Sequence, residues 1–147
     1  MHKHKEQSQQ KVQKRNIHSS GFKNKFAVSS VEQAMLRIRE GMTLQQQAHV
    51  FHKEGRSFLD RGDIQGALEC ISEALSLNPT AAYYVSRATC YKMQQKFSEA
   101  YFDYSYAIRL EPESASLYCQ RGLCVARLDR PTLAMEDLDE ACRVHFY

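Results

Sequence analysis

An internal repeat of 33 or 34 residues is the feature that most constrains how this 147-residue chain folds. When the sequence is slid against itself, five columns align, and the first offset is 33 and the second 34 in every column. Repeats of this length indicate a linear array in which each unit packs only on its neighbours. The columns are Gly55, Ala88 and Gly122; Phe58, Tyr91 and Val125; Ala67, Ala100 and Ala134; Ile71, Tyr104 and Leu138; and Ala74, Ala107 and Ala141.

Each unit has the apolar spacing and the turn residues of a helical pair. Gly62 and Asp63 separate the first pair, Pro79 and Pro112 close the first two units, and Pro131 suits the first turn of a helix. The expected helices span residues 44–61 and 64–77, 80–94 and 97–110, and 114–128 and 131–144. The sequence therefore predicts a three-repeat domain over 44–147, with units at about 44–79, 80–112 and 113–147.

These columns resemble the tetratricopeptide repeat over about residues 44–144. That family places a large, a small and an aromatic residue in the first helix, then Ala, a large apolar residue and Ala in the second, and a closing Pro. The resemblance implies an all-α, right-handed α-solenoid in which small residues let paired helices lie close. The matching residues are Phe51, Gly55, Phe58, Ala67, Ile71, Ala74 and Pro79; Tyr84, Ala88, Tyr91, Ala100, Tyr104, Ala107 and Pro112; and Tyr118, Gly122, Val125, Ala134, Leu138 and Ala141.

The resemblance also implies a peptide-binding groove lined by the first helix of each unit. Counting from the aligned small residues places ten candidates on that groove. They are His49, His52, Arg56, Leu59, Val85, Thr89, Met93, Cys119, Leu123 and Arg127.

Chaperone co-factors of this family hold the C-terminal carboxylate of heat-shock proteins with Lys, Asn and Arg side chains at five slots on the first helices of the three units. The matching slots here hold His52, Arg56, Ser86, Ser116 and Gln120. Only Arg56 is a permanent cation, so a free carboxylate would lack most of its charge-assisted partners. We therefore expect no binding of heat-shock C-terminal carboxylates.

The N-terminal segment differs in composition from the repeats. Residues 1–30 carry seven basic residues against Glu6 alone, a net charge of +6, while the whole chain carries +3. Such a segment cannot bury enough apolar surface to offset its ordering entropy, so we expect residues 1–28 to be a disordered basic arm. Ser29 and Glu32 fit a capping box, which predicts a short helix over 29–41. The basic residues are Lys3, Lys5, Lys11, Lys14, Arg15, Lys23 and Lys25.

The third unit lacks a closing Pro and a polar capping helix, so its last helix should leave an apolar edge. Either a partner covers this edge, or the chain is a fragment or a shortened isoform of a longer array. The second unit is one residue short, which we place in the loop after Pro79. We interpret Tyr101, Phe102, Tyr104 and Tyr106 as helix-packing residues. We interpret Glu136, Asp137, Asp139 and Glu140 as a solvated helix face, with binding of a basic segment, such as the chain's own arm, as the alternative.

The chain shows no nucleophile elbow, no phosphate-binding glycine loop and no zinc-ligand spacing. Its five cysteines form no Cys-x-x-Cys pair, and we expect reduced thiols that pack as small apolar residues. His49 and His52 share a helical face but lack a third ligand. We therefore expect no enzyme activity, no cofactor and no metal. The absence of a signal peptide or an apolar span predicts a cytoplasmic protein, with nuclear or ciliary location as alternatives.

The sequence favours a protein-interaction adaptor or scaffold that binds other proteins through the groove and through the apolar C-terminal edge. One alternative is a structural component of a cytoskeletal or ciliary assembly, docked through contacts of the basic arm with an acidic polymer or surface. A second alternative is nucleic-acid binding through that arm.

Overall fold

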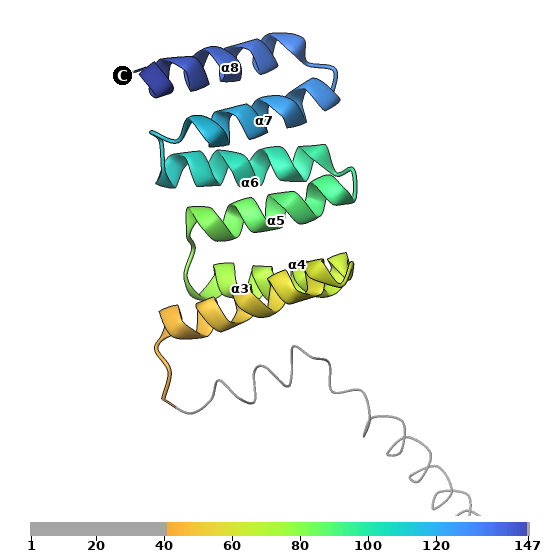
Figure 1. Ribbon diagram of the computed structural model, residues 1–147, viewed down its shortest axis with the longest axis vertical. Coiled ribbons are helices and arrows are strands. Elements are labelled where there is room, and N and C mark those ends of the chain that lie inside the picture. Colours follow the sequence, from red (N-terminus) through yellow and green to blue (C-terminus); the bar gives the residue numbers. More distant parts are fainter. Residues whose placement is uncertain (1–40, 147) are drawn as a thin grey trace, which may run out of the picture. The chain divides into compact units, whose positions relative to one another are not determined.

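The computed structural model describes residues 41–146, and these residues form six helices that pack in chain order (Figure 1). Each helix contacts the next, which gives three consecutive helix pairs. The expected all-helical array is therefore confirmed for this part of the chain. The helices are α3 (Leu44–Asp60), α4 (Ile64–Leu77), α5 (Ala81–Met93), α6 (Phe97–Leu110), α7 (Ala115–Arg127) and α8 (Pro131–Phe146).

The observed helix ends lie within two residues of the predicted ones. The link between α4 and α5 covers residues 78–80, whereas the link between α6 and α7 covers 111–114. The residue that shortens the second unit is therefore missing from the link that contains Pro79, as predicted. The expectations for a basic arm over 1–28 and for a helix over 29–41 fall on residues 1–40 and so lie outside the described residues, apart from Gly41.

Side-chain hydrogen bonds cap the N-terminus of α3 at the predicted position. Thr43 accepts a bond from the backbone N–H of Gln46, and the Gln46 side chain accepts one from the Thr43 N–H, at 3.2 and 2.9 Å. This reciprocal pair satisfies two donors that the first helical turn leaves free. Gly62, Gln95 and Asp129 occupy equivalent turns and all have a left-handed backbone, with φ of 79°, 59° and 55°. Only the first turn uses glycine, which adopts this conformation without steric cost.

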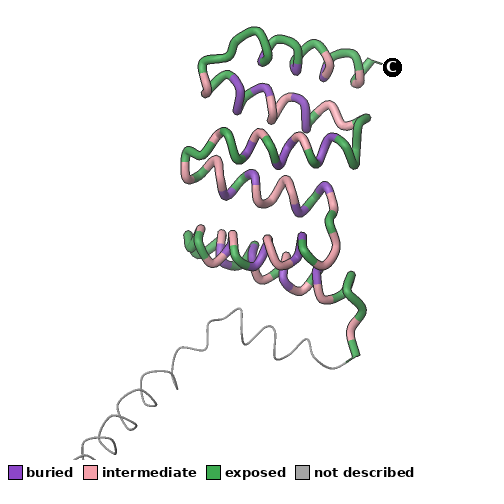
Figure 2. Tube along the Cα trace, turned by 180° about the vertical axis from the view of Figure 1, so that it is seen from behind, coloured by how far each residue is buried: buried purple, intermediate pink, exposed green. Residues whose placement is uncertain are grey.

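The column of small residues lies where the two helices of each repeat meet. A Cβ atom on Gly55 would lie 2.7 Å from Cγ1 of Ile71 and 3.3 Å from the carbonyl oxygen of Ala67. Ala88 fills the equivalent place in the second repeat and is fully buried. Along each helix the buried positions recur on the sides that face neighbouring helices (Figure 2). Close approach of paired helices therefore depends on these small side chains.

Two ion pairs join the helices of the second and third repeats. Arg87 on α5 donates two hydrogen bonds to Asp103 on α6, at 2.8 and 2.7 Å, and its third nitrogen lies 3.4 Å from Oγ of Ser72 on α4. Arg121 and Asp137 repeat this arrangement. Asp137 is thus buried and paired, and its interpretation as part of a solvated face was wrong, because its position on α8 faces α7.

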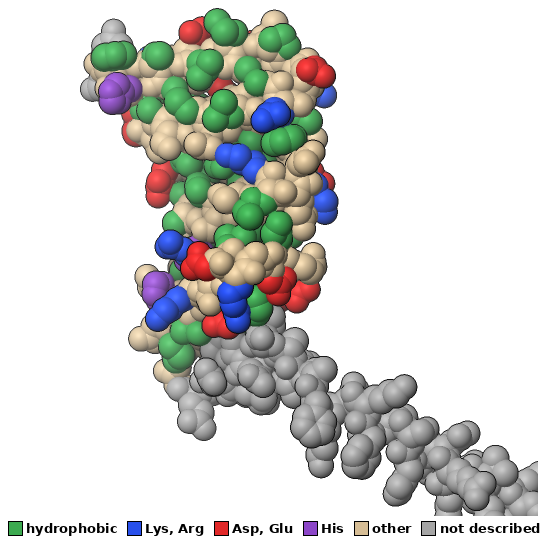
Figure 3. All heavy atoms as spheres, turned by 45° about the vertical axis from the view of Figure 1, so that its right-hand side comes forward, with side chains coloured by type: hydrophobic (Ala, Val, Ile, Leu, Met, Phe, Trp, Pro, Cys, Tyr) green, Lys and Arg blue, Asp and Glu red, His purple; other side chains and the backbone are tan. Residues whose placement is uncertain are grey.

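The outer face of α8 differs from the equivalent faces of α4 and α6. Leu138 is 44% exposed, whereas its counterparts Ile71 and Tyr104 are 0% and 1% exposed. Those two residues lie on helices that a further helix covers, and in the described part of the chain no helix follows α8. The predicted apolar edge is present, and hydrophobic side chains gather over α8 in Figure 3. None of the helices between residues 41 and 146 is long and apolar enough to cross a membrane.

Candidate protein-binding face

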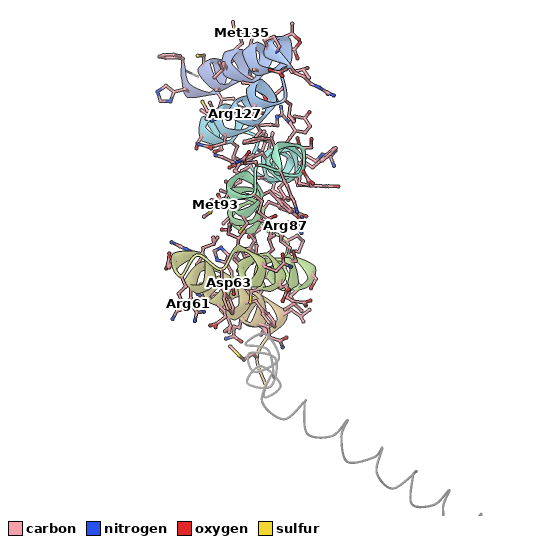
Figure 4. All side chains as sticks on the ribbon, turned by 90° about the vertical axis from the view of Figure 1, so that its right-hand side faces the viewer. Arg61, Asp63, Arg87, Met93, Arg127 and Met135 are labelled. Carbon is pink, nitrogen blue, oxygen red and sulfur yellow. The ribbon has the colours of Figure 1, made fainter. Side chains whose placement is uncertain are left out.

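The ten groove candidates all lie on α3, α5 and α7, and each is exposed or half-buried. We call the surface formed by their side chains the first-helix face. Met93 and Arg127 lie toward one edge of the helix stack, and Arg87 lies toward the other (Figure 4). These two candidates therefore lie away from Arg87, whose ion pair joins α5 and α6.

Side-chain contacts make the first-helix face continuous across the three repeats. Nε2 of His52 on α3 lies 2.7 Å from Oγ of Ser86 on α5, and its ring centroid lies 4.5 Å from that of Tyr83. Lys92 on α5 donates a hydrogen bond of 2.7 Å to Oε1 of Gln120 on α7. These contacts hold polar groups from neighbouring first helices in fixed positions.

A hollow of about 590 Å³ opens on this face, between the end of α5, the start of α6 and α7. It brings together three predicted candidates, Met93 from the end of α5 and Leu123 and Arg127 from α7. Met93 and Leu123 are 52% and 56% exposed, and the Arg127 guanidinium lies 5.7 Å from the ring centroid of Phe97. The other lining residues are Lys92, Gln95, Phe97 and Cys124.

The first-helix face carries several positive charges. Arg56 and Arg127 are the arginines among the ten candidates, and Lys92 lies with Arg127 at the hollow. Burial lowers the pKa of His52 below 6.5, and the nearby charges of Arg56 and His49 lower it further. His52 is therefore a neutral hydrogen-bonding side chain at neutral pH, and it becomes an additional cation only under acidic conditions.

Three of the five slots that would hold a C-terminal carboxylate are occupied by groups that pair with other residues of this chain. His52 and Ser86 are hydrogen-bonded to each other, and Gln120 accepts its bond from Lys92. Lys92 thereby places one cation beside the Gln120 slot. Among the five slots themselves, Arg56 carries the one permanent positive charge.

The buried thiols are packing groups. Burial raises the pKa of Cys70 and of Cys90 to about 11, which keeps both protonated and unreactive at neutral pH. Cys142 is exposed on α8, and Cys119 is half-buried on the first-helix face. Within residues 41–146, no group of three or more His, Cys, Asp or Glu side chains is placed to hold a metal ion.

Sequence reasoning missed Lys92, which is central to the hollow. Lys92 stands 33 residues after Leu59, a candidate that was identified, so the repeat offset could have located it. It also missed the two ion pairs, although Arg87 and Arg121, and Asp103 and Asp137, both recur at an offset of 34. Of the aromatic residues on α6, Tyr104 packs as expected, but Phe102 and Tyr106 are 61% and 46% exposed.

Comparisons with known proteins agree with this architecture. No family model matches the chain. The mitochondrial import receptor subunit TOM70 of Homo sapiens is 27% identical over 101 residues, which are 65% of this chain and 17% of the receptor. The SGT1 homolog of Bos taurus is 31% identical over 94 residues, 61% of this chain and 28% of that protein. The chain thus spans less than a third of the length of either relative.

Among solved structures, the second tetratricopeptide domain of Spaghetti (RPAP3), bound to the HSP90 peptide SRMEEVD, superposes with a TM-score of 0.63. It is 26% identical, and the match covers 68% of this chain and 94% of that domain. Together with the helix pairs, the aligned small residues and the three-repeat length, this places the chain among the tetratricopeptide-repeat proteins.

Proposed function

We propose that this chain is an interaction adaptor that binds partner proteins through the first-helix face of its three repeats. The observation that carries the proposal is the continuity of this face, since His52 contacts Ser86 and Lys92 contacts Gln120 across the repeat boundaries. Tetratricopeptide domains generally bind proteins and typically do not catalyse reactions. No catalytic constellation competes with this reading in the described part of the chain, so we propose a non-enzymatic role.

Charge substitutions on the first-helix face test this proposal. Val85→Glu and Leu123→Glu place carboxylates at half-buried and exposed positions of α5 and α7, where they would repel partners. Because Val85 packs against the core, circular dichroism is needed to check that its variant keeps the helices. Leu110→Glu, on an exposed position of α6, is the matched control. Co-purification from the native cell should lose partners with the first two variants and keep them with the control. An unchanged set of partners with Val85→Glu and Leu123→Glu would contradict the proposal.

The exposed face of α8 supports a second contact surface. Met135 and Leu138 are 59% and 44% exposed, whereas Ile71 and Tyr104, the counterparts of Leu138, are buried on helices α4 and α6, which each contact a following helix. Burying such side chains under a partner stabilises the complex by removing apolar surface from water. We propose that this face of α8 also takes part in partner binding. In co-purification, Leu138→Glu should then lose a different set of partners from the set lost with Val85→Glu. The alternatives that depend on the basic arm concern residues outside the described range.

Binding of heat-shock carboxylates is not part of the proposal, although the domain of Spaghetti (RPAP3) binds such a peptide. In this chain, the five positions that match the carboxylate-binding residues of the family are neutral apart from Arg56. Two of them, His52 and Ser86, are hydrogen-bonded to each other. Calorimetry with SRMEEVD and with the same peptide amidated at its C-terminus tests this directly. We expect amidation to change the affinity little. Micromolar binding that is lost on amidation would contradict our expectation.

A further inference from the structure

The hollow at the end of α5 combines exposed apolar walls with unpaired positive charge. Met93 and Leu123 form walls that are more than half exposed, and Phe97 closes one side beneath Arg127. Exposed apolar side chains that line a concave surface are typical of binding sites, because a ligand that fits the concave surface removes them from water. The volume of about 590 Å³ is large enough for a side chain of a bound peptide together with its backbone.

The charge of this hollow has one sign. Lys92 and Arg127 line it, and none of its lining residues is acidic. Within residues 41–146, neither cation forms an ion pair with a carboxylate; Lys92 donates to the neutral amide of Gln120. Two other arginines of these repeats, Arg87 and Arg121, each have a bidentate carboxylate partner. The cations at the hollow therefore differ from the structural ones in having free hydrogen-bond donors.

The position of both cations is fixed by contacts on their apolar stems or head groups. Lys92 is tied to Gln120 and lies 5.9 Å from the ring centroid of Tyr104, and Arg127 lies against the ring of Phe97. A cation held in place loses less conformational freedom when it binds an anion than a freely rotating one does. The arrangement therefore favours an anionic group placed directly beside the apolar walls.

We infer that the hollow binds a partner peptide segment in which a large aliphatic side chain stands next to an acidic one. The aliphatic side chain lies between Met93, Leu123 and Phe97, and the carboxylate pairs with Arg127 and Lys92. The inference rests on the proposed function, because it names the partner chemistry of the same face. It concerns an internal acidic side chain, so a free C-terminal carboxylate is not required.

Selection from a library of short random peptides tests the inference on the full chain. The peptides are displayed with their C-terminal ends joined to the carrier, so that none has a free carboxylate terminus. We expect enrichment of Glu or Asp next to Leu, Ile or Met. In fluorescence anisotropy with the most enriched peptide, Arg127→Gln and Leu123→Ala should each weaken binding roughly tenfold, the factor expected from losing one charge-assisted hydrogen bond or one buried aliphatic contact.

Matched controls separate the hollow from the general surface. Arg109→Gln removes an exposed cation of α6, and Leu110→Ala shortens an exposed apolar side chain beside it, so both should leave the affinity unchanged. Circular dichroism of each variant checks that it keeps its helices. In a double-mutant cycle, replacing the acidic residue of the peptide by its amide should weaken binding to the unsubstituted chain more than binding to Arg127→Gln, in which only Lys92 is left to pair with the carboxylate.

The outcomes distinguish the two proposals. Peptides that depend on Val85 but not on Arg127 or Leu123 would overturn the inference and leave the binding face intact. Equal effects of the peptide substitution on the unsubstituted chain and on Arg127→Gln would show that the carboxylate binds elsewhere, and this also overturns the inference. If no enriched peptide is sensitive to Val85→Glu or Leu123→Glu, both the inference and the proposed function fail.

Discussion

The first repeat closes its helix pair with apolar contacts, whereas the second and third close theirs around a buried ion pair. The columns that hold Arg87 and Arg121, and Asp103 and Asp137, hold Glu54 and Cys70 in the first repeat. Cys70 is fully buried beside Gly55 and Ile71. The same helix-pair geometry is thus formed with an ion pair in the second and third repeats and with a buried cysteine in the first.

The difference has consequences for how repeats are coupled. Arg87 and Arg121 each contact a serine of the preceding repeat, Ser72 or Ser105, so each guanidinium connects three helices. A buried ion pair gives little net stability relative to an apolar contact, but removal of one partner leaves an uncompensated charge. We therefore expect the second and third repeats to respond more strongly than the first to substitutions at these columns.

The largest effect is expected for the removal of one member of an ion pair. Asp103→Ala leaves the Arg87 guanidinium without its carboxylate and should lower the free energy of unfolding by about 3 kcal/mol. Cys70→Ala, at the equivalent place in the first repeat, should cost about 1 kcal/mol. Urea denaturation measures both. The double variant Arg87→Leu with Asp103→Ala should recover part of the loss, and equal losses for Asp103→Ala and Cys70→Ala would remove the distinction between the repeats.

A smaller effect is expected at the column of small residues. Gly55→Ala brings its Cβ to 2.7 Å from Ile71, and the resulting repacking should cost about 2 kcal/mol. In the third repeat the nearest atom to such a Cβ, on Asp137, is 3.2 Å away. Gly122→Ala should therefore be close to neutral, because the better helix propensity of Ala, about 1 kcal/mol, offsets the closer contact. Thermal unfolding followed by circular dichroism compares the two, and a larger loss for Gly122→Ala would contradict this account.

The helix starts provide a third comparison. Thr43 caps α3 with a reciprocal pair of bonds, whereas Ser114 before α7 makes no side-chain capping bond. Thr43→Ala should cost about 1 kcal/mol, and Ser114→Ala should change the free energy of unfolding by less than about 0.5 kcal/mol. Hydrogen exchange at the first amides of each helix should show faster exchange only in the Thr43 variant.

The smallest effect concerns pH and is confined to the first repeat's contact with the second. Because folding lowers the pKa of His52 below 6.5, the unfolded chain takes up this proton first as the pH falls. The free energy of unfolding should therefore decrease as the pH drops below about 6.5, and His52→Gln should reduce that decrease. Urea denaturation between neutral and mildly acidic pH measures it. A pH dependence that is identical in His52→Gln would exclude His52 as its source.

Much of the architecture could be predicted because its determinants are local. The offset of 33, then 34, located the helix pairs and even the shortened link at Pro79, since each repeat contacts only its neighbours. The groove candidates followed from the same counting. Lys92 and the Arg–Asp pairs were missed because a charged residue in a helix is usually solvated, and only its neighbours decide whether it is paired.

The sequence by itself determined the number of repeats, the helix boundaries and the face that each first helix exposes, because small and large side chains recur at a spacing that permits one stacking order. Only the tertiary structure decided which charges are buried, that Asp137 is paired while Leu138 is exposed, and that Met93, Leu123 and Arg127 share a hollow. These features depend on side chains from three helices meeting in space, and no spacing within a single helix specifies such a meeting.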